Sequence, residues 1–224
     1  NQFESNGSGL TFSNNSTVTG TAVFGGTNPT LNTNVFTAAV TLGAANSNNA
    51  NNIQGNTYNS TLSINASGHQ FTTAENVFKG AVIMSANADN TIISIGDFKA
   101  GSSLVVDTGV SNLDINQSDF DVAVSIGGLS TTINNNEFSS TVGVTGNNVS
   151  FTNNATVTGA ATFSGTNPNI DSNTFTAGVT ISAANSDANI INTGNNYNGA
   201  VAINANGHKF NTSNFNNTLG GTGN

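Results

Sequence analysis

The feature that most constrains this chain is that it repeats itself. Residues 12–71 align without a gap on residues 151–210, at an offset of 139, and 33 of the 60 aligned pairs are identical. The identical pairs include Tyr58 with Tyr197 and His69 with His208. Agreement of this kind indicates an internal duplication. We therefore expect a chain built by stacking copies of a smaller unit.

The smaller unit is marked by an aromatic residue that follows an asparagine by two positions. After the first step the marker recurs every 18–22 residues, and Thr17 and Thr156 take the place of the ring in two units. We expect two internal files of stacked side chains. The aromatic file comprises Phe36, Tyr58, Phe78, Phe98, Phe120, Phe138, Phe175 and Tyr197. The asparagine ladder comprises Asn34, Asn56, Asn76, Asn136, Asn154, Asn173 and Asn195.

Each unit also contains short segments in which apolar residues occupy alternate positions. Val40 and Leu42 follow their aromatic by four and six residues, and Ile115 precedes its aromatic by five. Alternation places such residues on one side of a strand. One unit cannot bury its apolar side alone, but stacked units share a continuous core. The sequence predicts an all-β, right-handed parallel β-helix of about twelve coils of 18–22 residues, forming one domain over residues 1–224.

Composition excludes several classes of function. Asn occurs 43 times, 6% of residues are charged, and the formal net charge is −8 with three Lys and no Arg. Nucleic-acid binding requires a basic surface, so we exclude it. Cysteine is absent, which excludes disulfides and thiolate metal sites. The sequence has no apolar run long enough for a membrane-spanning helix, and its start without a signal segment leads us to expect a piece of a longer protein.

The repeat resembles those of vacuolating-cytotoxin-like autotransporter passenger domains. The resemblance covers nearly the whole chain and is clearest in residues 74–84 (AENVFKGAVIM), 134–144 (NNNEFSSTVGV) and 171–181 (DSNTFTAGVTI). It implies a β-helix carried to the surface of a Gram-negative cell, attached to the membrane only through a C-terminal barrel outside this sequence, and without catalytic residues. We therefore expect a non-enzymatic extracellular rod that acts in adhesion, colonisation or display. Its partner would be an unidentified host receptor or glycan.

Two other functions remain as alternatives. A polysaccharide-active β-helix enzyme requires converging carboxylates, or Ca²⁺-binding Asp residues with a basic group, and the sequence offers few basic residues. An ice-binding solenoid requires a regular outward array of Thr. The position five residues after the aromatic is expected to face outward, and across the coils it is irregular: Thr41, Ser63, Ile83, Ser125, Gly143, Thr180 and Ala202, with Val105 and Thr162 added by local realignment.

One acidic cluster could hold a cation. Asp97, Asp119 and Glu137 directly precede the aromatic of their coils, so they are expected to stack. The residues directly after the aromatic include Lys79, Lys99 and Asp121. One hypothesis is a Ca²⁺ site made by Asp97, Asp119, Asp121 and Glu137; the other, which we favour, is a solvated strip of ion pairs. We expect no other cofactor.

The two histidines occupy the same repeat position. His69 and His208 are separated by seven coils, so they cannot share a metal ion or a catalytic triad within one chain. We expect each to cap a turn or to be exposed.

Overall fold

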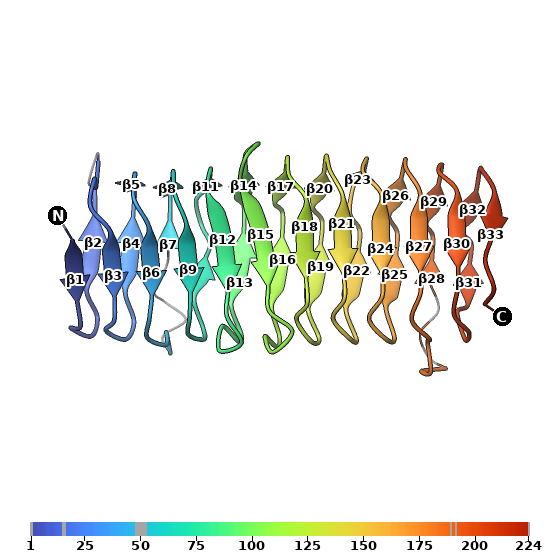
Figure 1. Ribbon diagram of the computed structural model, residues 1–224, viewed down its shortest axis with the longest axis horizontal. Helices are drawn as coiled ribbons and strands as arrows, with labels where there is room; N and C mark the ends of the chain where they lie inside the picture. Colours follow the sequence, from blue (N-terminus) through green and yellow to red (C-terminus); the bar gives the residue numbers. More distant parts are fainter. Residues whose placement is uncertain (1, 15–16, 48–52, 189, 191, 224) are drawn as a thin grey trace.

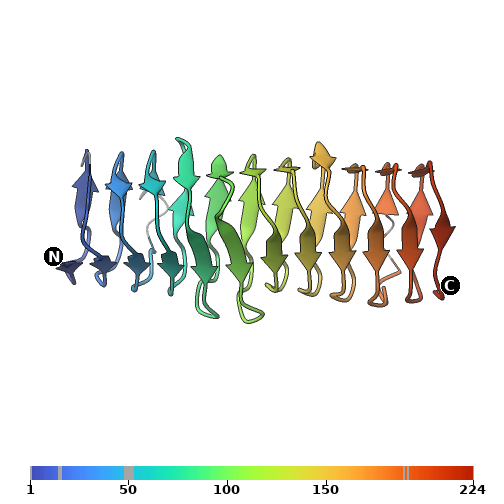
Figure 2. The same ribbon diagram turned by 45° about the horizontal axis from the view of Figure 1, so that its top comes forward.

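The structure is a computed structural model that describes residues 2–14, 17–47, 53–188, 190 and 192–223. Short parallel strands succeed one another in about eleven turns around a rod, with the two termini at opposite ends (Figures 1 and 2). The predicted parallel β-helix is therefore confirmed. The coils form three faces, which the chain visits in the order face 1, face 2, face 3.

Face 1 is a twelve-stranded sheet that runs the length of the rod, one strand for each predicted coil. Its strands are β1 (Phe3–Ser5), β3 (Ala22–Phe24), β6 (Val40–Leu42), β9 (Leu62–Ile64), β12 (Ala81–Met84), β15 (Ser103–Val106), β18 (Val124–Ile126), β21 (Val142–Val144), β24 (Ala161–Phe163), β27 (Val179–Ile181), β30 (Val201–Ile203) and β33 (Leu219–Gly220).

Face 2 is divided into sheets of three, six and two strands. The first holds β2 (Thr11–Ser13), β4 (Thr30–Asn32) and β7 (Ile53–Gln54). The second holds β10 (Gln70–Phe71), β13 (Ile92–Ser94), β16 (Asp114–Asn116), β19 (Thr132–Asn134), β22 (Ser150–Thr152) and β25 (Asn169–Asp171). The third holds β28 (Asn192–Thr193) and β31 (Phe210–Asn211).

Face 3 is a ten-stranded sheet that carries the aromatic file. Its strands are β5 (Val35–Phe36), β8 (Thr57–Tyr58), β11 (Asn76–Phe78), β14 (Gly96–Phe98), β17 (Asp119–Phe120), β20 (Glu137–Phe138), β23 (Thr156–Val157), β26 (Thr174–Phe175), β29 (Asn196–Tyr197) and β32 (Asn214–Phe215). Among the described residues, no helix is long and apolar enough to cross a membrane.

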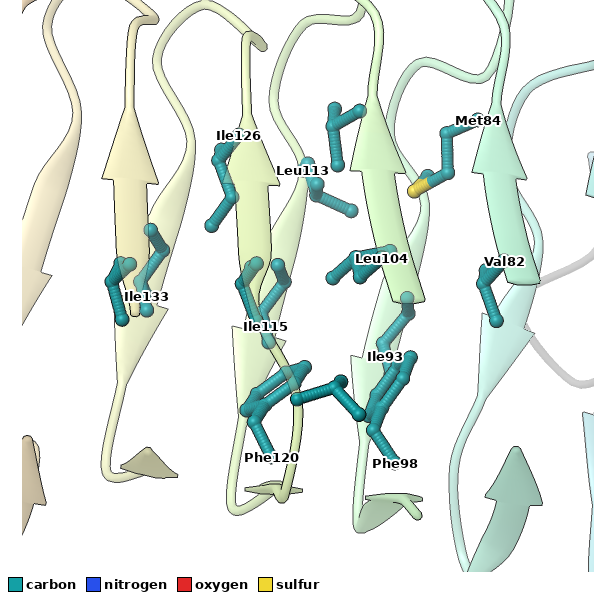
Figure 3. Close-up of a cluster of buried hydrophobic side chains, with 14 of the residues drawn as sticks. Val82, Met84, Ile93, Phe98, Leu104, Leu113, Ile115, Phe120, Ile126 and Ile133 are labelled. Carbon is teal, nitrogen blue, oxygen red and sulfur yellow. The ribbon is translucent and has the colours of Figure 1, made fainter. Parts of the chain in front are cut away.

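The core runs along the axis of the rod, because the inward residues of all three faces meet there. In one coil Leu104 of face 1, Ile115 of face 2 and Phe120 of face 3 converge, and each is at most 1% exposed (Figure 3). The coils on either side repeat this triangle with other apolar residues. Alternation within each strand thus produces a single core, in which every inward side chain also packs against the coil above and the coil below.

Coils differ in length only where they turn. The interval from Phe120 to Phe138 is 18 residues, the same as that from Tyr197 to Phe215, and the rings of each pair occupy the same register position. The interval from Phe98 to Phe120 is 22 residues, because residues 99–103 and residues 107–114 each contain two more than the corresponding corners of the next coil. Insertions at corners leave the stacked strands in register, which explains the variable spacing read from the sequence.

The corner between face 2 and face 3 requires a left-handed backbone conformation. The residue just before the asparagine ladder has positive φ in most coils: Thr33, Gly55, Ile95, Gln117, Asn135, Asn153, Ser172, Gly194 and Thr212. Gly and Asn adopt this conformation readily, whereas a β-branched residue such as Ile95 (φ 58°) does so at a cost in energy. The corner geometry is set by the fold and is imposed even on unsuitable residues.

The aromatic file departs from its predicted register in one coil of each duplicated arm. Val157, and not Thr156, lies between Phe138 and Phe175 in face 3, while Thr156 points outward beside Glu137. In the equivalent coil Val18, and not Thr17, pairs with Phe36. One additional residue after the ladder asparagine causes the shift, and such a shift exchanges inward and outward positions.

A ring from face 2 fills the space that Val157 leaves. Phe151 lies 5.6 Å from Phe138 and 6.1 Å from Phe175, measured between ring centroids, and is nearly parallel to both. Phe12 stacks on Phe36 in the same way at 6.1 Å. The aromatic stack therefore continues through the irregular coil by recruiting a ring from the neighbouring face.

Candidate functional surface

The asparagine ladder is a chain of buried hydrogen bonds that links three coils at each step. Asn154 donates from its backbone N–H and from Nδ2 to Oδ1 of Asn173, at 3.0 and 2.9 Å. Its Nδ2 also donates to the carbonyl of Ile133 in the preceding coil. The seven predicted members are each at most 1% exposed: Asn34, Asn56, Asn76, Asn136, Asn154, Asn173 and Asn195. The predicted ladder is confirmed, and it satisfies corner backbone groups that have no strand partner.

The ladder is interrupted in the central coils. Gly96 and Ser118 occupy ladder positions, and the backbone N–H of Gly96 donates to Oγ of Ser118. The backbone N–H of Ser118 in turn donates to Oδ1 of Asn136. A Cβ at position 96 would lie 3.1 Å from both Ile93 and Phe98. Local packing therefore disfavours a larger side chain at Gly96, and the serine hydroxyl supplies a shorter substitute for the amide.

The aromatic file forms a stack through the same coils. Phe98 and Phe120 are 4.4 Å apart, Phe120 and Phe138 are 4.8 Å apart, and Tyr197 lies 5.3 Å from Phe175, all in stacked geometry. The spacing follows the distance between adjacent strands. The rings are fully buried, so this file is part of the core and does not offer a binding platform.

The two tyrosines of this stack carry buried hydroxyl groups without a hydrogen-bond partner. Burial raises the pKa of Tyr58 above its ordinary value. Burial likewise raises the pKa of Tyr197, and the negative charge of Asp171 contributes in the same direction. Both hydroxyls remain neutral, and they fill space in the stack at the cost of a lost water contact.

The sequence predicted that each histidine caps a turn or is exposed, and for His69 the exposed alternative is wrong. His69 is 0% exposed, and burial lowers its pKa to about 4, with the Ala44 carbonyl acting in the opposite direction. The Ala44 carbonyl is not placed to accept a hydrogen bond from the ring, so both ring nitrogens of His69 are buried without a hydrogen-bond partner. The equivalent His208 is half-buried, and its Nε2 lies 2.8 Å from the carbonyl oxygen of Ala183. His208 thus holds the turn contact that the sequence predicted.

The acidic residues stack as predicted, but they do not form a set of metal ligands. Asp97, Asp119 and Glu137 occupy one register position on adjacent strands of face 3, and the latter two are exposed. Asp97 pairs with Lys99, whose Nζ lies 2.6 Å from Oδ2. This hydrogen bond raises the pKa of Lys99, with a smaller contribution from the nearby Asp121. The pair formed by Lys99 and Asp97 is a contact of the kind that the ion-pair hypothesis expects.

Across the described ranges, no three His, Asp or Glu side chains gather closely enough to hold a metal ion. No cleft or cavity is found along the same part of the rod. Asp89 and Asp107, which also belong to the charged central coils, accept hydrogen bonds from the backbone N–H groups of Ser111 and Gly109. These two carboxylates therefore cap turns and are separate from the acidic column on face 3, which consists of Asp97, Asp119 and Glu137.

The outward positions of face 1 lie in the register that the sequence predicted. Val105 and Thr162 fall in line with the rest of the file, although they lie two residues and one residue further from the marker of their coil than the other members do. The file reads Thr41, Ser63, Ile83, Val105, Ser125, Gly143, Thr162, Thr180 and Ala202. Ile83 and Val105 are 43% and 46% exposed. Ile83 and Val105 are thus neighbouring exposed apolar side chains in a file whose other members from Thr41 to Ala202 are small or polar.

Comparison with known proteins gives no relative from which a role could be transferred. The chain matches no protein-family model, no curated protein and no solved structure.

Proposed function

We propose that this chain is a non-enzymatic rod on the outside of a Gram-negative cell, as part of an autotransporter passenger. Its role is to hold an adhesive segment away from the cell, or to contribute to adhesion and colonisation through a host receptor or glycan. The resemblance of the Asn-x-Phe repeat to such passengers supports the location. The observation that carries the rod function is that successive coils repeat the same pattern of buried inward side chains along the described chain.

Because successive coils repeat the same buried pattern, the number of coils sets the length of the rod. Each coil hydrogen-bonds to its neighbours through three parallel faces and, in most coils, through the ladder amide. Bending the rod would break several of these contacts at once. Twelve strands about 4.8 Å apart extend over roughly 50 Å, so adding or removing a coil changes reach in small, defined steps.

The surface location is tested on intact cells that express the full-length gene. An antibody raised against the purified chain is expected to label unpermeabilised cells, and protease treatment of intact cells is expected to remove the label while leaving a periplasmic marker untouched. Labelling that appears only after permeabilisation would overturn the proposed location.

The rod function is tested by removing one whole coil. Deletion of residues 121–138 joins Phe120 to Ser139 and preserves the register of all remaining coils, so the shortened chain is expected to retain its circular dichroism spectrum. Deletion of residues 121–139 removes 19 residues and serves as the matched control, which is expected to lose stability because only two residues then join Phe120 to Val142, where the corner that follows Phe120 in the intact chain has three. On cells, adhesion should decline in steps as successive whole coils are removed. Adhesion that is abolished by loss of one coil and unaffected by loss of another would indicate a local binding site instead of a spacer.

A further inference from the structure

The outer surface of face 1 combines an apolar centre with an absence of charge along its middle. Ile83 on β12 and Val105 on β15 are direct neighbours in register. They lie on the fifth and sixth of the twelve strands, at the middle of the rod. Among the described strands of face 1, Glu4 on the first strand is the one charged member of this outward file.

This distribution differs from that of the rest of the central coils. Ten of the fourteen charged residues of the chain fall within residues 75–138, yet the outward positions of β12 and β15 carry isoleucine and valine. Two adjacent apolar side chains with nearly half of their surface exposed are unfavourable on a strand that faces only water. Depletion of charge around a central apolar contact is the pattern of a protein interface.

We propose that face 1 is a self-association surface, on which a second copy of this chain packs its own face 1, with Ile83 and Val105 of one copy against the same pair of the other. The proposal concerns a surface that is separate from the ladder and the acidic column, and it does not depend on the cellular location proposed above.

A second copy fits this surface in shape. Face 1 presents an open, regular sheet along the length of the rod (Figure 1). Two such sheets can pack face to face about 10 Å apart when large and small side chains alternate between them. Ser63 and Ser125 flank the apolar pair in the outward file, and these small residues leave room for the larger side chains of the partner. A two-fold axis brings the same patch of both chains together, as in most homodimers.

A second copy also fits this surface in area. Twelve strands about 4.8 Å apart, each offering roughly 12 Å of width, give about 600–700 Å² from each chain. Stable interfaces use about 800 Å² from each partner, and weak ones use less. We therefore expect a reversible dimer that forms at high concentration, with its affinity centred on the apolar pair.

Sedimentation analysis of the whole purified chain over a concentration series tests the proposal. The wild-type chain is expected to shift from monomer to dimer as concentration rises, and the double variant Ile83→Thr, Val105→Thr is expected to weaken association by tenfold or more. Threonine already occupies this outward position in three other coils, at Thr41, Thr162 and Thr180, so the variant should fold normally. The matched control is Ser63→Thr with Ser125→Thr, which adds the same residue to face 1 and retains both apolar side chains.

A crosslinking measurement provides a second readout that does not rely on affinity. The chain has no cysteine, so Val105→Cys and Thr132→Cys each create a single reactive site, on face 1 and face 2 respectively. A short bismaleimide reagent is expected to yield covalent dimers several-fold faster with Val105→Cys than with Thr132→Cys. A wild-type chain that remains monomeric throughout, a dimer that the threonine pair does not weaken, or equal crosslinking at both cysteines would each overturn the proposal.

Discussion

The two duplicated arms, residues 12–71 and 151–210, and the central coils between them form the same kind of coil from different residues. Residues 12–71 contain no charged residue and residues 151–210 contain three, whereas residues 75–138 contain ten of the fourteen. In the arms the ladder is continuous asparagine, and in the centre it passes through Gly96 and Ser118. The inward apolar triangle nevertheless recurs in both regions, although Asn192 takes its face 2 position in one coil. The comparison shows that the core tolerates little variation, while corners and outward positions are free to diverge.

The two arms also differ from each other in informative ways. His69 is buried without a partner, while His208 reaches a carbonyl. Ile53 of the first arm corresponds to Asn192 of the second, which is equally buried, and Oδ1 of Asn192 accepts a hydrogen bond from the backbone N–H of Ile170. Equivalent positions of the duplication therefore need not have the same residue or the same environment, because each coil is completed by its neighbours. Three measurements would sharpen or break these comparisons.

The largest expected effect is the loss of a ladder amide in an arm. Asn173→Ala removes the acceptor of two donors of Asn154 and the donor to the carbonyl of Phe151, all of them buried. We expect the free energy of unfolding to fall by about 3 kcal/mol, since each buried group left unpaired costs about 1–3 kcal/mol. Chemical denaturation of the variant measures this effect.

The matched variant in the centre is Ser118→Ala, which removes one acceptor of a backbone N–H and one donor to the Asn116 carbonyl. Its expected loss is smaller, about 1–2 kcal/mol. Equal losses in the two variants would mean that the amide ladder contributes no more than a single hydroxyl, and the distinction between arms and centre would fail.

A pH-dependent effect should distinguish the two histidines. Burial lowers the pKa of His69 from 6.5 to about 4, so the folded state binds its proton less readily than the unfolded state. Neutral His69 therefore makes its full contribution to the free energy of unfolding above pH 6.5. This contribution is lost as the pH falls from 6.5 to about 4, because the unfolded chain takes up the proton first. A shift of this size corresponds to about 3 kcal/mol at most.

The measurement compares melting temperatures at pH 7 and pH 4.5 for the wild type and for His69→Gln. The carboxylates titrate in both proteins, so the histidine effect is the part of the acid-induced decrease that disappears in the variant. His208→Gln is the control and should retain the decrease. A His69→Gln protein that loses stability with acid as steeply as the wild type would contradict the burial of His69.

The smallest expected effect concerns the corner before the ladder. Ile95 adopts φ 58° where the equivalent positions of other coils hold Asn135 and Asn153. Ile95→Asn should raise the free energy of unfolding by about 1 kcal/mol, because asparagine adopts the left-handed conformation at lower cost. The control is Asn135→Ile, which should lower it by a similar amount. A destabilising Ile95→Asn would show that the partly exposed isoleucine makes contacts worth more than the strain.

The sequence by itself determined the parallel β-helix, the stacking of the aromatic file and the ladder, and the outward register of face 1. These follow from period-two alternation and from a marker that recurs once per coil, both of which are local properties of the chain. The alignment of Asp97, Asp119 and Glu137 could be predicted for the same reason, because each directly precedes a marker residue.

Only the tertiary structure decided the features that depend on neighbouring coils. The inward position of Val157 follows from the rings stacked around it, since one additional residue could have been absorbed before or after the strand. The burial of His69 depends on how turns of different lengths pack. A repeat therefore specifies which residues share a position, whereas packing between coils specifies what each position contacts.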